Sequence, residues 1–226
     1  MINKLFLLLV IFCFSTYLFA QKKDLKNVSI DDFIAETQYS NDLANEVNII
    51  WWIPTEYWKV VFANDDSVPE ADAEAITDLL KEYLVVIAIK GKVGMFGGIT
   101  YDTRETIQSL TKVMYKTVPL KFVDENSINP DLLNFLSIIK PMMKNLLGPM
   151  GENMQVFLFG NPEENNVLPV DVYSNETISF LLADYKEDVQ LPLACLLEEK
   201  VCPEDNKLHS GKWKFCPFHG LELVSK

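Results

Sequence analysis

The stretch that decides the fold is residues 84–90, LVVIAIK, in which only the last side chain is polar. A run this apolar and β-branched predicts a strand covered on both faces, because a strand with one face in water alternates apolar and polar residues. A second run of the same character, residues 48–53 (NIIWWI), lies upstream. Pro54 bounds that run or places it at a sheet edge, since proline cannot donate to a strand ladder.

An aromatic cluster follows from the second run. Trp51, Trp52, Tyr57 and Trp58 could form a platform for a sugar or a peptide. Burial of each ring is worth a few kcal/mol, so the cluster is expected in the core.

Helices are expected where apolar residues recur at helical spacing behind a capping residue. These segments are residues 28–34 capped by Ser29, 71–83 behind the capping-box pattern Ser67 to Glu70, 102–115, and 129–147 capped by Asn129. The last is apolar around more than one stripe, which predicts an internal core helix, with partner or membrane contact as the alternative.

Further strands are expected at residues 99–101, 155–159, 178–182 and 190–196. The glycine-rich residues 91–98 fit no phosphate-loop pattern and predict a hairpin turn or bulge. Residues 160–166 carry the turn signals of a loop. The order shows neither strict βαβ alternation nor a repeat, so the predicted class is α+β, with packed helices on a mixed or antiparallel sheet.

Charge and composition exclude two classes of protein. The 226 residues include 20 Lys+Arg and 32 Asp+Glu, a net charge of −12, and 49% are hydrophobic. Nucleic-acid binding needs clustered positive charge, and a disordered chain lacks this much apolar material. The length predicts one domain, or one domain with a small appendage.

The N-terminus predicts export. Residues 5–20 (LFLLLVIFCFSTYLFA) carry no charge and follow the basic residue Lys4. The run is shorter than the about 20 residues of a membrane span and ends in alanine, as a secretory signal does. We therefore expect a signal peptide over residues 1–20, a periplasmic or secreted protein, and no transmembrane segment after cleavage; an uncleaved anchor is the alternative.

The remaining chain is rich in lysine and asparagine and has one arginine, Arg104. An exposed helix position is expected for Arg104, and a buried ion pair or an anion clamp is the alternative. The composition and the signal ending resemble exported proteins of Bacteroidota. Residues 49–54, 96–100 and 148–153 together resemble a set of uncharacterised exported bacterial proteins, a likeness that implies no activity.

All reactive residues of the exported chain lie in its last 32 positions. They are Cys195, His209, Cys202, Cys216 and His219. A body over residues 21–193 therefore cannot build a Ser-His-Asp or Cys-His engine or a histidine-bound catalytic metal. A carboxylate-dependent hydrolase stays open, although no acidic pair stands out.

The tail, residues 194–226, contains two related segments. Residues 202–205 (CPED) and 216–220 (CPFHG) resemble the CPxCG knuckles of a zinc ribbon, with Asp205 at the second cysteine position and Asn206 at the glycine position. The resemblance implies a zinc ligand set of Cys202, Asp205, Cys216 and His219, which tetrahedral zinc allows.

A disulfide is the alternative for the same tail. Cys202 and Cys216 could pair in an oxidising compartment, and closing a loop of about 15 residues would add roughly 3 kcal/mol in the chain-entropy model. A Cys195–Cys202 pair is a third possibility. Residues 210–215 predict a strand that packs Trp213 and Phe215 on one face.

Three functions remain open. The leading expectation is an exported, non-enzymatic protein that binds an unknown protein or envelope component. The alternatives are a zinc-binding protein acting through its tail, and a carboxylate-dependent hydrolase.

Overall fold

The computed structural model describes residues 21–226 except 42, 44 and 161–169. The predicted signal peptide and most of the predicted loop at 160–166 lie outside the described residues. The chain divides into two units. The body unit is Lys23–Leu196, and the C-terminal unit is Leu197–Lys226 together with residues 21 and 22.

The elements of the body unit follow in chain order. They are η1 (Leu25–Asn27), α2 (Ile30–Thr37), β1 (Gln38–Ser40), β2 (Glu46–Ile53), α3 (Thr55–Ala63), α4 (Glu70–Leu80), β3 (Leu84–Val93), β4 (Ile99–Tyr101), α5 (Arg104–Leu110), β5 (Thr111–Tyr115), β6 (Val118–Pro119), β7 (Lys121–Phe122), η2 (Glu125–Ser127), α6 (Pro130–Leu146), η3 (Gly148–Asn153), β8 (Gln155–Gly160), β9 (Thr177–Leu182), β10 (Tyr185–Gln190) and η4 (Ala194–Leu196).

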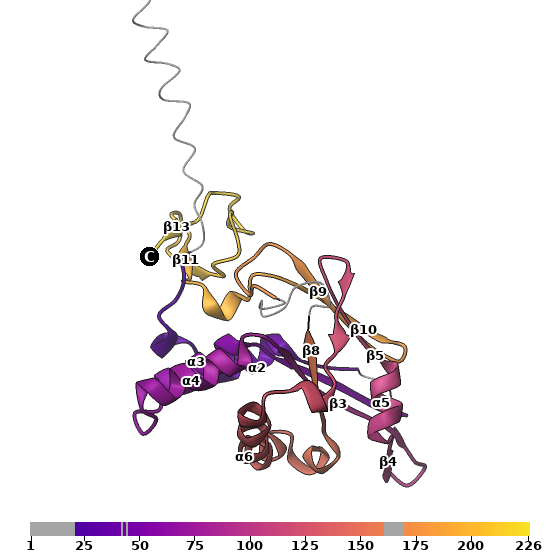
Figure 1. The fold of residues 1–226 in the computed structure, drawn as a ribbon. Coiled ribbons are helices and arrows are strands. Elements are labelled where there is room, and N and C mark those ends of the chain that lie inside the picture. Colours follow the sequence, from indigo (N-terminus) through magenta and orange to yellow (C-terminus); the bar gives the residue numbers. More distant parts are fainter. Residues whose placement is uncertain (1–20, 42, 44, 161–169) are drawn as a thin grey trace, which may run out of the picture. The chain divides into compact units, whose positions relative to one another are not determined.

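Two antiparallel sheets organise the body unit (Figure 1). The larger has the strand order β1-β2-β3-β8-β7 with β4 paired to β3, and the smaller has the order β10-β9-β5-β6. Every described pairing is antiparallel. The predicted α+β class is thus confirmed.

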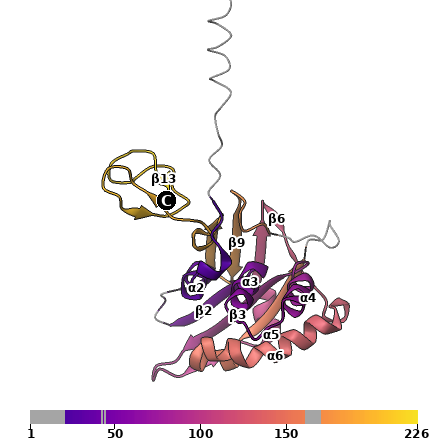
Figure 2. The same ribbon diagram turned by 90° about the vertical axis from the view of Figure 1, so that its left-hand side faces the viewer.

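The central strands β2 and β3 are covered on both faces. Successive side chains of a strand point to opposite faces. Trp51 meets Tyr57 of α3 with ring centroids 6.1 Å apart, and Trp52 meets Phe180 of β9 at 5.8 Å. Figure 2 shows α2, α3 and α4 on one side of these strands. The aromatic cluster is therefore core, as predicted, and β3 is the predicted buried strand.

Glycine-rich residues form the predicted hairpin between β3 and β4. The amide of Gly94 donates to the carbonyl of Gly98 at 2.7 Å, and Gly97 has φ +80. That left-handed conformation suits a residue without a Cβ.

Two helix boundaries differ from the prediction. The α4 helix begins at Glu70 behind Pro69, because the Ser67 hydroxyl donates to Asp65 at 2.6 Å and does not cap the helix. The α5 helix ends at Leu110, and the next residues form β5, which pairs with β9. Tertiary pairing thus overrides the helical periodicity expected to residue 115.

Two other segments were mispredicted. Helix α3 follows directly after Pro54, within a stretch whose aromatic content suggested a strand. The strand expected at 190–196 is absent among the described residues, since β10 ends at Gln190 and η4 follows a cis Leu191–Pro192 bond.

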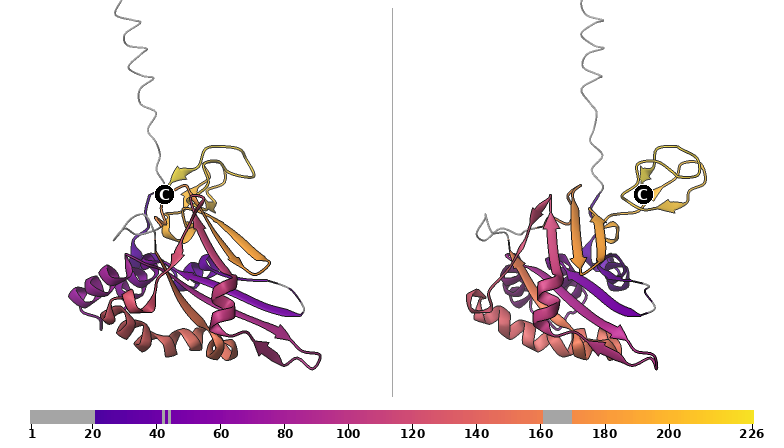
Figure 3. Two further views of the ribbon diagram at one scale, coloured as in Figure 1. Left: turned by 45° about the vertical axis from the view of Figure 1, so that its right-hand side comes forward. Right: turned by 90° about the vertical axis from the view of Figure 1, so that its right-hand side faces the viewer.

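Helix α6 is only partly a core helix. Asn129 caps it by accepting from the amide of Asp131 at 2.9 Å, and its buried side holds Leu132 and Met143. Its other side exposes large apolar residues: Leu133, Ile138, Met142 and Leu146. Figure 3 shows the helix running along the lower edge of the body unit. Among the described residues, no helix is both long and apolar enough to cross a membrane.

The C-terminal unit contains the two-residue strands β11 (Lys200–Val201), β12 (Leu208–His209) and β13 (Val224–Ser225), in the order β12-β11-β13. Lys22 forms an isolated bridge with Leu197, and the amide of Glu198 donates to the carbonyl of Gln21 at 2.8 Å. The first described residues of the chain are therefore held by the last unit.

The strand expected at residues 210–215 is a turn. The amide of Trp213 donates to the carbonyl of Ser210 at 3.0 Å, and Phe215 makes only an isolated bridge. Trp213 and Phe215 are 46% and 53% exposed, so the predicted packing of these two rings is wrong.

Candidate metal centre

The C-terminal unit has almost no apolar core. Its buried cluster consists of Cys202, Cys216 and Leu223. Units below about 40 residues rarely fold on apolar burial alone and usually need a disulfide, a metal or an oligomer. The two sulfur atoms inside this unit are therefore the candidates for its cross-link.

The first cysteine opens a tight turn. The amide of Asn206 donates to the carbonyl of Cys202 at 2.8 Å, and the amide of Cys202 donates to the carbonyl of Lys207 at 2.9 Å. Asn206 has φ 59. The turn thus closes on a left-handed residue, a conformation that asparagine tolerates better than most.

The second cysteine opens the same turn. The amide of Gly220 donates to the carbonyl of Cys216 at 2.9 Å, and the amide of Cys216 donates to the carbonyl of Leu221 at 2.8 Å. Gly220 has φ 66, matching Asn206 in the first turn. The two CP segments therefore form one backbone structure twice, and each presents its cysteine sulfur to the interior.

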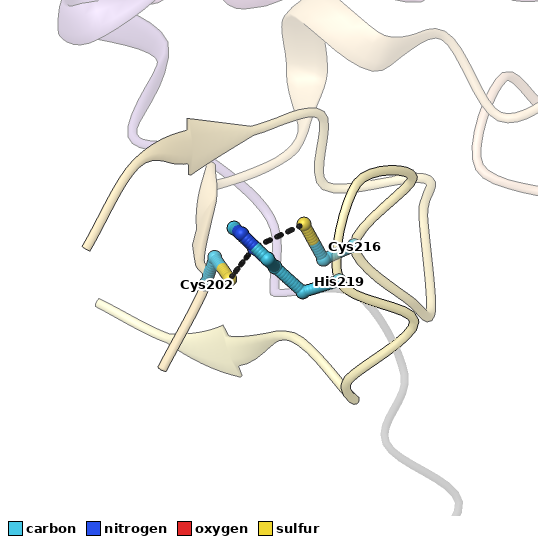
Figure 4. Close-up of side chains that lie close together, drawn as sticks. All are labelled: Cys202, Cys216 and His219. Atoms are coloured by element: carbon cyan, nitrogen blue, oxygen red, sulfur yellow. Dashed lines mark hydrogen bonds between the residues drawn. The ribbon is translucent and has the colours of Figure 1, made fainter. Parts of the chain in front are cut away.

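Three potential ligand atoms converge between the turns (Figure 4). His219 Nδ1 lies 3.3 Å from Cys202 Sγ and 3.6 Å from Cys216 Sγ, and all three atoms are within 4.8 Å of one another. Both cysteines are buried, whereas His219 is exposed. The imidazole thus closes the solvent side of a sulfur pair.

The two thiols differ in acidity. Burial raises the pKa of Cys202 above its ordinary value, and the neighbouring Cys216 adds to this rise. Burial also acts against ionisation of Cys216, but hydrogen bonds from the amides of Phe218 and His219 lower its pKa below the ordinary value. Cys216 is therefore the more acidic sulfur, and a metal ligand must be a thiolate.

Asp205 lies outside the group of three. Its carboxylate accepts from the amide of Lys207 at 3.1 Å and pairs with the Lys207 ammonium at 3.3 Å. The hydrogen bond from that amide is the main reason for its lowered pKa, and a hydrogen bond from Cys202 adds to it. The structure thus brings together three of the four ligands that the zinc-ribbon resemblance implied.

His209 is the functional residue that sequence reasoning missed. Its Nε2 lies 3.5 Å from Cys216 Sγ, and the residue is 8% exposed. The ring lies beside Trp213 at 5.8 Å and Phe218 at 6.1 Å. The one signal for it in the sequence is that both histidines of the chain fall in the tail.

Cys195 lies in the body unit and takes no part in this cluster. Burial, followed by the charge of Glu36, raises its pKa to about 12. Its amide and that of Ala194 donate to the Glu36 carboxylate at 2.9 and 2.6 Å. All three described cysteines are free thiols in the structure.

The body unit has a cavity of about 660 Å³. Arg104 borders it, with a side chain 35% exposed, an ion pair to Glu125 at 2.7 Å and a hydrogen bond to the carbonyl of Val156 at 2.9 Å. The guanidinium also lies 4.7 Å from the Phe157 ring. The expectation of a simply exposed arginine is therefore wrong, because the side chain anchors α5 to β8.

Acidic residues border the same cavity. Glu105, Asp124 and Glu125 are among its lining side chains. A general acid needs a raised pKa, whereas the pKa of Glu105 is lowered by its own backbone amide and by Thr103. Glu125 is already paired with Arg104. This arrangement gives the hydrolase hypothesis no specific support.

Fold and site together define an α+β protein with a small cysteine- and histidine-centred unit at its C-terminus. No family model, curated protein or solved structure matches the chain. Function is therefore argued from the residues and their geometry.

Proposed function

We propose that the C-terminal unit binds one Zn²⁺ ion through Cys202, Cys216 and His219, and that the ion holds the unit folded. The carrying observation is the convergence of the three ligand atoms, with sulfur to nitrogen distances of 3.3 and 3.6 Å. On one tetrahedral zinc, with Zn–S about 2.3 Å and Zn–N about 2.0 Å, such atoms lie about 3.5 Å apart.

The geometry favours zinc over a disulfide. Both sulfur atoms contact the same imidazole nitrogen, and amides of the two turns hydrogen-bond the sulfurs. Such hydrogen bonds stabilise thiolates, the form in which cysteine binds metal. A disulfide would join the sulfurs at about 2.0 Å and leave His219 without a partner of this kind.

The test is the intact mass and zinc content of the full chain, purified unreduced and without chelator. We expect one zinc per chain and three free thiols in the processed protein. Cys216→Ser should abolish zinc binding, and Cys195→Ser is the matched control that should retain it. A mass lower by two hydrogens without zinc would overturn the proposal in favour of the disulfide.

We also propose that the protein is exported, with residues 1–20 removed. The support is the basic start, the uncharged run and its alanine end. The mature N-terminus in a periplasmic or culture fraction should be Gln21. Recovery of unprocessed chain in the cytoplasm would contradict export.

A binding role for the body unit is the second proposal, and the tip of the β3–β4 hairpin supports it. Met95 and Phe96 are 94% and 98% exposed there. Adjacent large apolar side chains in water are typical of contact residues. The double change Met95→Ser and Phe96→Ser should abolish co-purification of an envelope protein cross-linked to the wild type, whereas Lys92→Ser should not. Unchanged co-purification would contradict this role.

A further inference from the structure

We infer that His209 is the fourth ligand of this zinc site, giving a Cys₂His₂ set, and that Asp205 stays outside it. The inference rests on the proposed zinc binding and names the residue that completes the site. It replaces the aspartate that the zinc-ribbon resemblance implied.

The first argument is a third matching distance. His209 Nε2 lies 3.5 Å from Cys216 Sγ, the same separation expected for nitrogen and sulfur on one zinc ion, about 3.5 Å. Cys216 is thus flanked by both imidazoles of the chain. One ion placed between these groups would satisfy all three contacts.

The second argument is how His209 is held. It is the last residue of β12 and pairs with Lys200 of β11, two residues before Cys202. Trp213 and Phe218 flank its ring. A buried imidazole nitrogen needs a partner, and zinc coordination would supply one stronger than a thiol.

The third argument is charge. Two thiolates and two neutral imidazoles make a neutral site with Zn²⁺, whereas an aspartate in place of one imidazole leaves a net negative charge inside the unit. Buried net charge is costly, and structural zinc sites are built mainly from cysteine and histidine. The Asp205 carboxylate also has Lys207 as its partner at two atoms.

A closed set of four protein ligands has a consequence for chemistry. Catalytic zinc keeps one position open for water or substrate, and structural zinc does not. With His209 bound, the ion stabilises the unit and performs no hydrolysis.

The experiment uses the full exported chain loaded with Zn²⁺, in which X-ray absorption counts the imidazoles around the metal. We expect two sulfur ligands and two imidazoles. One imidazole would overturn the inference while leaving zinc binding intact. A wild-type protein that binds no zinc would instead overturn the proposed function, and this inference with it.

Two variants give an independent measurement by competition with a chromophoric chelator. His209→Ala should weaken Zn²⁺ binding by more than about 100-fold, because even outer-shell changes cost about 10- to 100-fold. Asp205→Asn keeps an acceptor for the Lys207 amide and should leave binding unchanged. The reverse pattern, with loss in Asp205→Asn and retention in His209→Ala, would overturn the inference. Should His209→Ala fail to fold, the imidazole count on the wild type still decides.

Discussion

The two units of this protein bury opposite kinds of side chain. The body unit encloses β-branched and aromatic residues between two sheets and a helical layer, as around Trp51 and Trp52. The C-terminal unit encloses two cysteines and a histidine, and it exposes Leu208, Trp213, Phe215 and Phe218. Apolar burial can fold the first unit, whereas the second needs bonds to its polar interior.

Removal of zinc should break this contrast most strongly. Apparent binding energies of structural zinc in finger peptides are about 10–16 kcal/mol, far more than a three-residue cluster can supply. A strong chelator should therefore unfold the C-terminal unit and leave the body unit folded. Limited proteolysis should then cut within residues 197–226 and spare the rest.

Cysteine alkylation provides the internal control for that experiment. Cys202 and Cys216 should react with iodoacetamide only after chelation, whereas Cys195 should stay unmodified because burial raises its pKa to about 12. Proteolysis of both units together after chelation would show that they do not fold independently.

The body unit should respond instead to loss of apolar volume. Trp51→Ala should lower its free energy of unfolding by about 3–5 kcal/mol in urea titrations, the usual cost of a large cavity. Trp51→Phe is the matched control with a smaller cost. No hydrogen-bond partner for the buried indole Nε1 is found among the described residues. Zinc content should stay at one per chain in both variants, and a zinc loss would contradict separate units.

A smaller effect is expected at the end of the body unit. Glu36 binds two backbone amides, those of Ala194 and Cys195. Glu36→Gln should destabilise the unit by about 1.5–3 kcal/mol, since hydrogen bonds to a charged group contribute that much. Glu74→Gln on the exposed face of α4 is the control, and equal effects of the two changes would refute the clamp.

The smallest effects concern the two left-handed turn residues. Asn206→Gly should be neutral or slightly stabilising, because φ 59 suits glycine. Gly220→Ala should destabilise by more than about 1 kcal/mol, because alanine is strained at φ 66. Thermal release of zinc measures both, and an unchanged Gly220→Ala variant would show that the turns are not equivalent.

Much of the fold was predictable because its strongest signals are local. The runs at 84–90 and 48–53 are strands, and Ser29 and Asn129 cap their helices. The errors at Ser67 and after Leu110 have one cause. A side chain or a strand found a partner distant from the periodic pattern, Asp65 in the first case and β9 in the second.

The site was predictable only in part. The CP segments placed Cys202, Cys216 and His219 together, since turn chemistry is local in sequence. His209 lies between the two segments and reaches Cys216 through the pairing of β12 with β11, a long-range feature that no motif encodes. Asp205 occupies the motif position but turns to Lys207, two residues away.

The bridge between Lys22 and Leu197, with the Glu198 amide on the Gln21 carbonyl, sets an order of assembly. Under the proposed export, Gln21 is the first residue of the mature chain, and its partners are among the last to be synthesised. The C-terminal unit cannot close until translation and translocation are complete. The body unit, whose partners all come earlier, can fold before it, so zinc uptake would mark the final step of maturation.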